Sequence, residues 1–397
     1  MPLKALVIIL LALAGIACAA PEVREVREVR EVRETAPAPL QDSGWIDALA
    51  QAVGDRRVLQ LGESGHGMAE TYKLKTDIVR RMHQRHGFDV LAVEGGLAEC
   101  WVTAQNLASW SAEQSMRACF WGAWSSEEAE ELFEYLRSAA ASRRPLRLVG
   151  FDNSPTSTAF MQWLESNPGT PPALLAAERD FIRLFDVSPE KDEPMAPVQA
   201  RAVANYRLAY AALEDPGLRM IVADRLATLD FDPDNFSREV FERTREQRMA
   251  ANLLQHIADN PGSRVMVWAH NAHVSHAYSG FVGGVERQGE FVHRALGDQS
   301  YAVGIYPLAG RGYAWFINQE YELRAPRAGS LESQLAQLPG NPVFLDLRGA
   351  DARAQPWTRQ QVVSFEWGLN EQVIVPAQMY DGLLLIREVT PITRSLD

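Results

Sequence analysis

Seven short, continuously apolar runs limit what this chain can fold into. Strands with one exposed face alternate polar and apolar residues, whereas strands covered on both faces are apolar throughout. Helical patterns separate the early runs, which favours crossover connections between parallel strands. The sequence therefore predicts a three-layer α/β/α domain with a mostly parallel sheet. The runs span residues 57–61, 89–95, 145–151, 264–270, 300–306, 342–348 and 382–388.

A long span without strand-like runs separates the third run from the fourth. It contains helical patterns such as "VQARAVANYRLAYAAL" and "FSREVFERTREQRMAANLLQHI". Apolar residues there recur at helical spacing. We interpret residues 153–261 as a helical lobe inserted into a domain that covers residues 45–397.

The first 20 residues have the pattern of a secretory signal peptide. A lysine stands near the start, an apolar run too short to span a bilayer follows, and small residues close the segment. Cleavage after Ala19 or Ala20 predicts an exported protein, periplasmic or secreted. Cys18 offers an alternative lipid anchor, although Gly15 occupies the position where a bacterial lipoprotein signal has leucine.

The net charge and the length of the apolar stretches exclude some classes of protein. The formal net charge of −12 argues against nucleic acid as a partner, because a duplex binder needs a basic face. No internal stretch is long and apolar enough for a membrane span.

The low-complexity Glu-Val-Arg repeat and linker at 21–44 carry no predicted chemistry. Cys100 and Cys119 are the only cysteines left after cleavage, and the sequence leaves their pairing open.

Titratable side chains follow the predicted strands at the points where the strands end. Open α/β sheets bind ligands beyond the carboxyl ends of their strands. The glycine-rich turn "LGESGHGMAE" (61–70) follows the first run. These strand ends carry, in chain order, Glu63 and His66, Glu94, Asp152, His270 and His273, and Tyr306.

The residue types at this edge suit acid–base chemistry. A helix N-terminus disfavours a charged imidazole, and a neutral His66 is what a general base must be. Glu63 and Glu94, which we expect to end adjacent strands, can orient that histidine or hold a water. Lys75 either snorkels along an apolar helical stripe or reaches the crevice to stabilise an oxyanion.

A metal site is an alternative interpretation of the same residues. His270, His273 and His276 recur every three residues in "WAHNAHVSH". Histidines with two glutamates nearby can complete a coordination sphere. The residues alone leave both chemistries open.

Several segments, taken in order, resemble the erythromycin esterase family. The resemblance runs from about residue 45 to the end of the chain. Its pieces are "LGESGHGMAETYKLK", "GFDVLAVEGG", "FWGAWSSEEAEELFEYLR", "VGFDN", "REQRMAAN", "VMVWAHNAHVS", "GSLESQL" and "YDGLLLI".

The resemblance implies a cofactor-free, metal-independent hydrolase that opens a macrolactone or related small-molecule ester with an activated water. His66 would be the general base, Glu63 and Glu94 would position it or the water, and His270 and His273 would complete the site. Substrate contacts are expected from Lys75, Arg248, Asp152 and Tyr306.

Two points limit what the resemblance implies. Lys75 stands where the family has an arginine, which keeps the charge but loses the planar, two-pronged donor. Family members also differ in substrate, so macrolide specificity does not follow. Alternatives are a metal-dependent hydrolase that uses His66, His270, His273 and the two glutamates, and a non-catalytic binding protein of the cell envelope.

Overall fold

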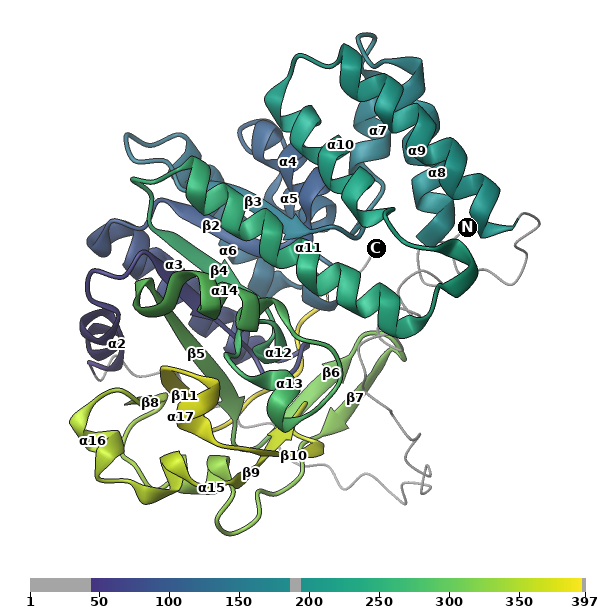
Figure 1. The fold of residues 1–397 in the computed structure, drawn as a ribbon. Coiled ribbons are helices and arrows are strands. Elements are labelled where there is room, and N and C mark those ends of the chain that lie inside the picture. Colours follow the sequence, from purple (N-terminus) through teal and green to yellow (C-terminus); the bar gives the residue numbers. More distant parts are fainter. Residues whose placement is uncertain (1–43, 186–193, 395–397) are drawn as a thin grey trace.

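A seven-stranded sheet forms the centre of the computed structural model, which describes residues 44–185 and 194–394 (Figure 1). All neighbouring strands pair in parallel except the last two, β11 and β8. Each of the seven predicted runs forms one of these strands, so the predicted mostly parallel sheet is confirmed. Their spatial order is β3 (Arg147–Asp152), β2 (Val90–Gly96), β4 (Val265–Trp268), β1 (Val58–Leu61), β5 (Ser300–Pro307), β11 (Gly382–Ile386) and β8 (Val343–Asp346).

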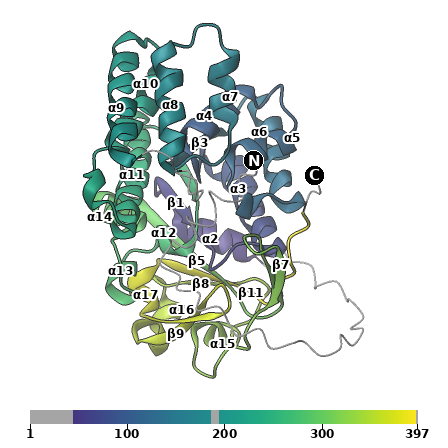
Figure 2. The same ribbon diagram turned by 90° about the vertical axis from the view of Figure 1, so that its right-hand side faces the viewer.

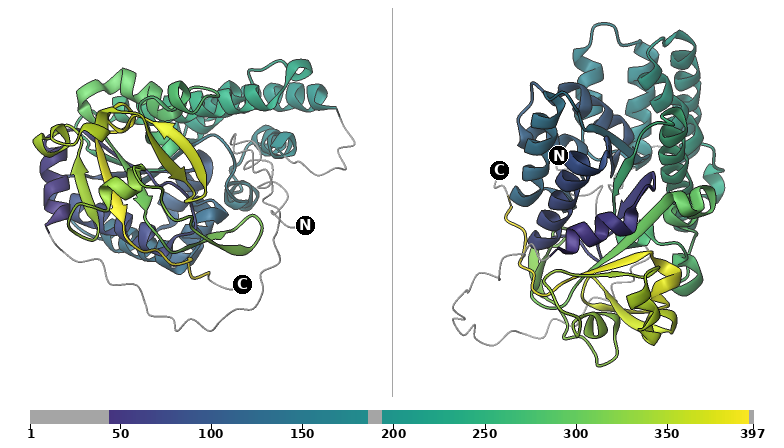
Figure 3. Two further views of the ribbon diagram at one scale, coloured as in Figure 1. Left: turned by 90° about the horizontal axis from the view of Figure 1, so that it is seen from below. Right: turned by 90° about the vertical axis from the view of Figure 1, so that its left-hand side faces the viewer.

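Helices cover both faces of the sheet, which makes the three layers (Figure 3). Leu91 and Val93 of β2 pack in one apolar cluster with α2 (Trp45–Val53), α3 (Ala69–His86) and α6 (Glu127–Ala140). The alternate residues Val90 and Ala92 pack on the other face with α11 (Arg238–Asp259) and α14 (Gln288–Leu296). Because both side-chain rows are buried, the strands are apolar throughout.

The chain between β3 and β4 builds a helical lobe at one end of the sheet (Figure 2). Its helices share a third apolar cluster with α4 (Leu97–Asn106), where Phe181, Tyr206 and Ile221 are fully buried. The helix α11 then leads from the lobe back onto the sheet. The lobe helices are α7 (Ala159–Ser166), α8 (Pro172–Phe185), α9 (Met195–Ala212) and α10 (Pro216–Thr228), with the short η2 (Pro233–Asn235) before α11.

Two antiparallel hairpins lie outside the main sheet. One pairs β6 (Arg311–Ala314) with β7 (Gln319–Glu322), and the other pairs β9 (Val362–Glu366) with β10 (Asn370–Ile374). Neither hairpin was predicted from the sequence, because these strands are short and β7 and β10 are largely exposed and polar. Both hairpins reach the glycine-rich loop after β1, through Tyr313 and Trp367.

The remaining helices are short or join these elements. They are α5 (Ala112–Cys119), η1 (Gly122–Trp124), α12 (Asn271–Val274), α13 (Tyr278–Phe281), η3 (Gly297–Gln299), α15 (Leu331–Leu335), α16 (Ala350–Arg353), η4 (Pro356–Arg359) and α17 (Pro376–Met379).

Some predictions concern residues that the structure does not describe. The signal peptide and nearly all of the Glu-Val-Arg repeat and linker fall in residues 1–43, outside the described ranges. Among the helices at residues 44–185 and 194–394, none has the length and apolar character needed to cross a bilayer.

Candidate functional site

The candidate site lies at the carboxyl ends of β1, β4 and β2, where three segments meet. The expectation that Glu63 and Glu94 end adjacent strands is wrong, because β4 lies between β1 and β2. The turn that follows β4 therefore inserts between the two glutamates. It binds both, since the Asn271 amide donates to the Glu63 carbonyl (2.8 Å) and the His270 amide donates to Glu94 Oε2 (3.0 Å).

Glu63 is fully buried and serves three partners. His66 Nδ1 lies 2.6 Å from Glu63 Oε1, and the Trp124 indole N–H donates to the same oxygen at 2.6 Å. The Lys75 ammonium donates to the other oxygen at 2.8 Å. Burial opposes ionisation of Glu63, but the Lys75 charge and His66 outweigh it and lower the pKa of Glu63. Glu63 is therefore an anion that accepts a hydrogen bond from the Nδ1–H of His66.

His66 is a neutral imidazole at neutral pH. Burial lowers the pKa of His66, and the Glu63 carboxylate offsets this only in part. The ring is enclosed by Trp124 at 4.8 Å, Trp367 at 5.0 Å and His270 at 5.2 Å between centroids. Nδ1 is used by Glu63, and Nε2 has no hydrogen-bond partner within residues 44–185 and 194–394. This nitrogen is left to accept a proton.

The structure does not bring the Lys75 ammonium to the crevice. Its side chain is fully buried behind Glu63, where it also donates to the Ala269 carbonyl (3.2 Å) and lies 4.2 Å from the centre of a Trp268 ring. It therefore contacts Glu63 rather than an incoming substrate. Neither direction that helical periodicity left open for Lys75 is realised, because the ammonium reaches neither water nor the crevice and pairs with the buried Glu63 carboxylate.

Glu94 is the centre of a chain of alternating charges, which we call the charge ladder. Glu94 Oε1 accepts from Arg245 (3.0 Å) and lies 3.2 Å from His273 Nε2. Burial opposes ionisation of Glu94, but His273 and Arg245 together hold its pKa well below the usual value. The ladder runs Asp152, Arg245, Glu94, His273, Glu246 and Arg287.

His273 is a charged member of this ladder. Its Nδ1 lies 2.9 Å from Glu246 Oε2, so a carboxylate faces each ring nitrogen. Burial would lower the pKa of His273, but Glu246 and Glu94 outweigh it and raise the pKa to about 9. A histidine that carries both protons at neutral pH cannot act there as a base. His273 is placed to fix Glu94 and α11 by charge.

His270 has a different environment from His273. It caps α12 (Asn271–Val274), with Nδ1 accepting from the Ala272 amide at 3.2 Å. Its Nε2 lies 2.9 Å from Glu366 Oε1, at an angle outside hydrogen-bond range. Glu366 was not among the site residues predicted from the sequence, because it lies in the β9–β10 hairpin, which was not predicted either.

Asp152, Arg248 and Tyr306 were expected to contact substrate. Asp152 joins the charge ladder and accepts from Arg245 at 2.5 Å. Arg248 points away from it, to Asp224 (3.0 Å) and Asn252 (3.1 Å). The Tyr306 side chain is buried, and its hydroxyl donates to the Tyr380 hydroxyl (3.2 Å). The structure thus brings Asp152 to the cluster but not Arg248 or Tyr306.

The arginine that α11 contributes to the charge ladder is Arg245, one helical turn before Arg248. Arg245 begins the segment "REQRMAAN", which resembles the family, but no site role was predicted for it. Helical spacing carries a signal that favours it: Arg245 shares a stripe with Met249, which is fully buried against the sheet.

The geometry within the described ranges contains no group of three or more His, Cys, Asp or Glu side chains arranged to hold a metal ion. The histidines of the alternative metal site are engaged separately. His66 pairs with Glu63, and His273 is bound on both nitrogens by Glu94 and Glu246.

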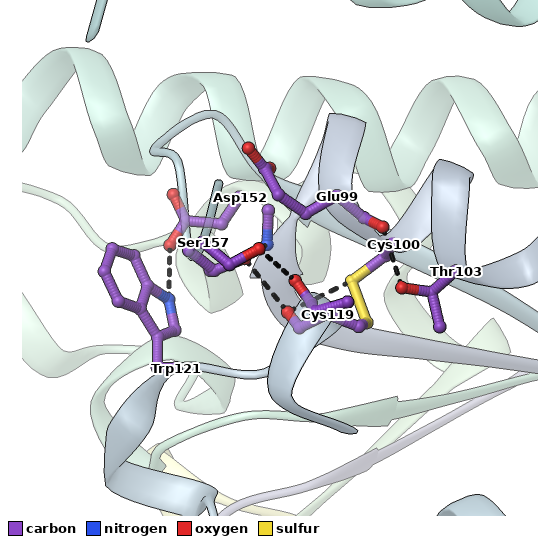
Figure 4. Close-up of a disulfide and its surroundings, with 10 residues drawn as sticks. Glu99, Cys100, Thr103, Cys119, Trp121, Asp152 and Ser157 are labelled. Atoms are coloured by element: carbon purple, nitrogen blue, oxygen red, sulfur yellow. Dashed lines mark hydrogen bonds between the residues drawn. A yellow bond between two sulfur atoms is a disulfide. The ribbon is translucent and has the colours of Figure 1, made fainter. Parts of the chain in front are cut away.

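Cys100 and Cys119, whose pairing the sequence left open, form a disulfide with a Cα–Cα distance of 4.4 Å (Figure 4). It ties α4 to the end of α5, directly before the segment that carries Trp121 and Trp124. The Trp121 indole donates to Asp152 (3.4 Å), as Figure 4 shows, and Trp124 donates to Glu63. The disulfide therefore fastens a segment that contacts two carboxylates of the site.

These features define a three-layer α/β protein with a histidine–carboxylate site at the carboxyl edge of its sheet. The family model described as Erythromycin esterase matches residues 83–389. Since this range is well over half of the chain, the protein belongs to the erythromycin esterase family. The match includes Glu94, His270 and His273 and begins after Glu63 and His66.

The relatives are distant in sequence but cover most of the chain. Putative hydrolase YbfO of Bacillus subtilis (strain 168) is 24% identical over 385 residues, which covers 86% of each chain. Erythromycin esterase type II of Escherichia coli is 22% identical over 337 residues, covering 72% of this chain and 80% of that one. Family membership and these names support a hydrolase.

A solved structure of a mutant of the erythromycin esterase EreC, in its open conformation, has the same fold. It superposes with a TM-score of 0.61 at 14% identity, covering 89% of this chain and 95% of that chain.

Proposed function

We propose that this protein is an exported carboxylic-ester hydrolase in which neutral His66 activates a water molecule. The observation that carries the proposal is the His66–Glu63 pair: Nδ1 is held by a carboxylate at 2.6 Å and Nε2 is left without a partner among the described residues. Such an imidazole, with a lowered pKa, is ready to accept a proton at neutral pH.

The reaction would use these groups in one sequence. His66 Nε2 takes a proton from water as the water oxygen bonds to the ester carbonyl carbon, and a tetrahedral oxyanion forms. The Glu63 carboxylate accepts a hydrogen bond from the His66 Nδ1–H and stabilises the imidazolium by its charge. The carbon–oxygen bond to the alcohol then breaks, and the imidazolium returns its proton to the leaving oxygen. One water and one ester give one acid and one alcohol.

Lys75 has a supporting role in this scheme. A lone buried carboxylate would raise the proton affinity of the histidine that it contacts. The Lys75 ammonium on the second Glu63 oxygen draws off part of that charge. His66 thus keeps its orientation from Glu63 and stays neutral.

The substrate class is proposed from the family. The erythromycin esterases among the relatives suggest a macrolactone or a related ester. Export is proposed from the N-terminal signal pattern and is supported by the buried disulfide, because disulfides persist in oxidising compartments. Mass spectrometry of the mature N-terminus tests export, and a chain that starts at an acylated Cys18 would indicate a lipoprotein instead.

Purified protein assayed on a panel of macrolides and simpler esters, with and without a chelator, tests the function. We expect ester hydrolysis that a chelator leaves unchanged and that is lost in His66→Asn. Activity abolished by a chelator and restored by zinc would favour the metal-dependent alternative. Binding of a panel compound without turnover would favour the envelope binding protein.

A further inference from the structure

Three buried polar atoms without a hydrogen-bond partner in the described chain lie on residues beside His66. They are His270 Nε2, Glu366 Oε1 and Trp367 Nε1. The side chains of His270 and Glu366 are 9% and 4% exposed. Buried polar atoms are nearly always paired, so neighbouring exceptions call for an explanation.

The tip of the β9–β10 hairpin puts two of these atoms at the site. Trp367 has a φ of 59° and the next residue, Gly368, a φ of 64°. The Leu369 amide donates to the Glu366 carbonyl (3.0 Å), which closes a tight turn with two left-handed residues. A tryptophan is rarely found there, and backbone strain of this kind gathers at functional sites.

The hairpin is locked onto the glycine-rich loop. The Trp367 amide donates to the Ser64 carbonyl at 2.7 Å. A Cβ on Gly65 would lie 2.9 Å from Trp367 Cα, so only glycine allows this approach. The Trp367 ring therefore meets His66 edge-on at 5.0 Å and lies 6.1 Å from His270.

The tautomer of His270 follows from its other nitrogen. Because Nδ1 accepts from the Ala272 amide, the proton of the neutral ring is assigned to Nε2. That nitrogen lies 2.9 Å from Glu366 Oε1 but its N–H is not aimed at the oxygen. The Nε2–H group thus lies near a carboxylate and remains able to donate a hydrogen bond to a third group.

We propose that Glu366 is the positioning residue of His270, so that the site contains two histidine–carboxylate pairs, His66–Glu63 and His270–Glu366. The two imidazole rings are 5.2 Å apart. The Ala272 amide sets the Nε2–H tautomer of His270, and the Glu366 carboxylate holds that N–H by its charge, so that it can donate a hydrogen bond to a substrate oxygen while His66 takes the proton from water. The catalytic use of this proton rests on the proposed ester hydrolysis, whereas the His270–Glu366 pair itself does not.

Other charged groups near His270 do not replace Glu366. Glu94 accepts from the backbone amide of His270 and not from its ring. The His273 ring is 6.4 Å away between centroids and is held by Glu94 and Glu246. Glu366 is therefore the carboxylate that faces the His270 ring.

The first test measures the pair without any substrate. Imidazole ¹⁵N signals report which ring nitrogen carries the proton. Glu366→Gln keeps the size of the side chain but offers an amide N–H beside its oxygen. We expect the His270 Nε2–H signal to shift in this variant, because that N–H no longer faces a carboxylate, while Nδ1 remains the acceptor nitrogen. Identical His270 signals in the wild type and the variant would overturn the proposal.

The matched control is Glu332→Gln, which changes a buried carboxyl that also holds the β9–β10 hairpin. Glu332 Oε1 accepts from the Phe365 amide (2.7 Å), next to Glu366, and burial raises the pKa of Glu332 to about 7. An amide oxygen can replace this acceptor, so the His270 signals should not change. If Glu332→Gln moves them equally, Glu366 acts only through the fold of the hairpin, and the proposal fails.

The second test measures ester hydrolysis. Glu366→Gln should lower kcat on the order of 10²-fold with little change in KM, and Glu366→Asp, which retains the charge, should recover part of the rate. Equal losses in both variants would overturn the role in catalysis. If the ¹⁵N signals respond as expected but the wild type hydrolyses no ester, the pair stands and the proposed function fails.

Discussion

Lys75 Nζ lies 2.8 Å from Glu63 Oε2, and both side chains are fully buried. Burying two charges is costly, and their attraction compensates for this only when the geometry is good and the remaining oxygens are bonded. Here Glu63 Oε1 accepts from Trp124 and faces His66. The ion pair is thus part of the arrangement that sets the protonation of His66.

Replacing Lys75 with methionine should destabilise the protein. The change leaves the Glu63 carboxylate buried without its cation, which costs about 3–5 kcal/mol of unfolding free energy. Lys73, which is exposed on the same helix, gives the control variant Lys73→Met. Urea unfolding of both variants measures the difference, and equal stabilities would show that the buried pair contributes nothing.

The variant Lys75→Arg tests the expectation drawn from the family arginine. The ammonium lies 4.2 Å from the centre of a Trp268 ring and 3.2 Å from the Ala269 carbonyl. A larger guanidinium must fit a closed site, and overpacking costs about 1–3 kcal/mol. We expect reduced stability and no gain in kcat/KM, and a faster enzyme would show that the substitution reaches the substrate.

His66→Asn should lower kcat/KM on the order of 10²- to 10⁴-fold while the protein stays folded, because the variant lacks the base. Burial lowers the pKa of His66 below its ordinary 6.5, so the neutral form persists into mildly acidic solution. The wild-type rate should therefore fall only below pH 6.5. His86→Asn, at the C-terminal end of α3, the helix that follows the His66 loop, is the control for stability and rate. An acid limb above pH 7 would contradict the assignment.

His273 should make the unfolding free energy depend on pH in the alkaline range. Its folded-state pKa of about 9 lies above the unfolded value near 6.5, so protons stabilise the fold. This contribution is complete below pH 6.5 and is lost as the pH rises through 9. Unfolding free energies from pH 6 to 10 should fall more steeply for the wild type than for His273→Gln. Parallel curves would mean that His273 is not charged.

Removing the disulfide should lower both the unfolding free energy and the rate of ester hydrolysis. The double variant Cys100→Ser/Cys119→Ser frees a loop between residues 19 apart in sequence, which is worth about 3 kcal/mol. The loop precedes Trp124, so kcat/KM should also fall. Urea unfolding and ester assays of wild type with and without a reductant provide the comparison. Unchanged stability would show that packing alone holds α4 to α5.

The sequence predicted the parts of the fold that depend on local patterns. Each strand of the main sheet is an apolar run, and each run is visible without knowing its neighbours. The spatial order of strands is not local, which is why β4 was not placed between β1 and β2. The hairpins β6–β7 and β9–β10 escaped because their short strands are partly polar and have one exposed side.

The candidate site likewise has one part that was predicted from the sequence and one part that was not. Strand ends indicated where Glu63, His66, Glu94, His270 and His273 would lie, and the roles of these residues remain predictions. The protonation state of His273 could not be predicted from the sequence, because its charge depends on carboxylates from β2 and α11. Glu366 and Trp367 come from a hairpin whose contact with the loop is visible only in three dimensions.

Glu94→Gln tests whether Glu94 serves as a structural anion in addition to any contact with water. Both oxygens are used, Oε1 by Arg245 and His273 and Oε2 by the His270 amide. The amide of glutamine must place its NH₂ group opposite one of these donors, so one hydrogen bond is replaced by two N–H groups that face each other. We expect unfolding free energy to fall by about 2–3 kcal/mol, together with a loss of kcat/KM as His270 shifts.

The control for this prediction is Glu99→Gln in the neighbouring helix. Burial raises the pKa of Glu99 to about 8, and its Oε2 has no partner in the described chain. At pH 7 the change replaces one neutral group with another of the same size, so stability should change by about 1 kcal/mol or less. If Glu94→Gln is as mild as Glu99→Gln in urea unfolding but still abolishes turnover, Glu94 acts on the water or substrate and not through the charge ladder. If both its stability and its turnover fall, the charge ladder is what holds His270 beside His66.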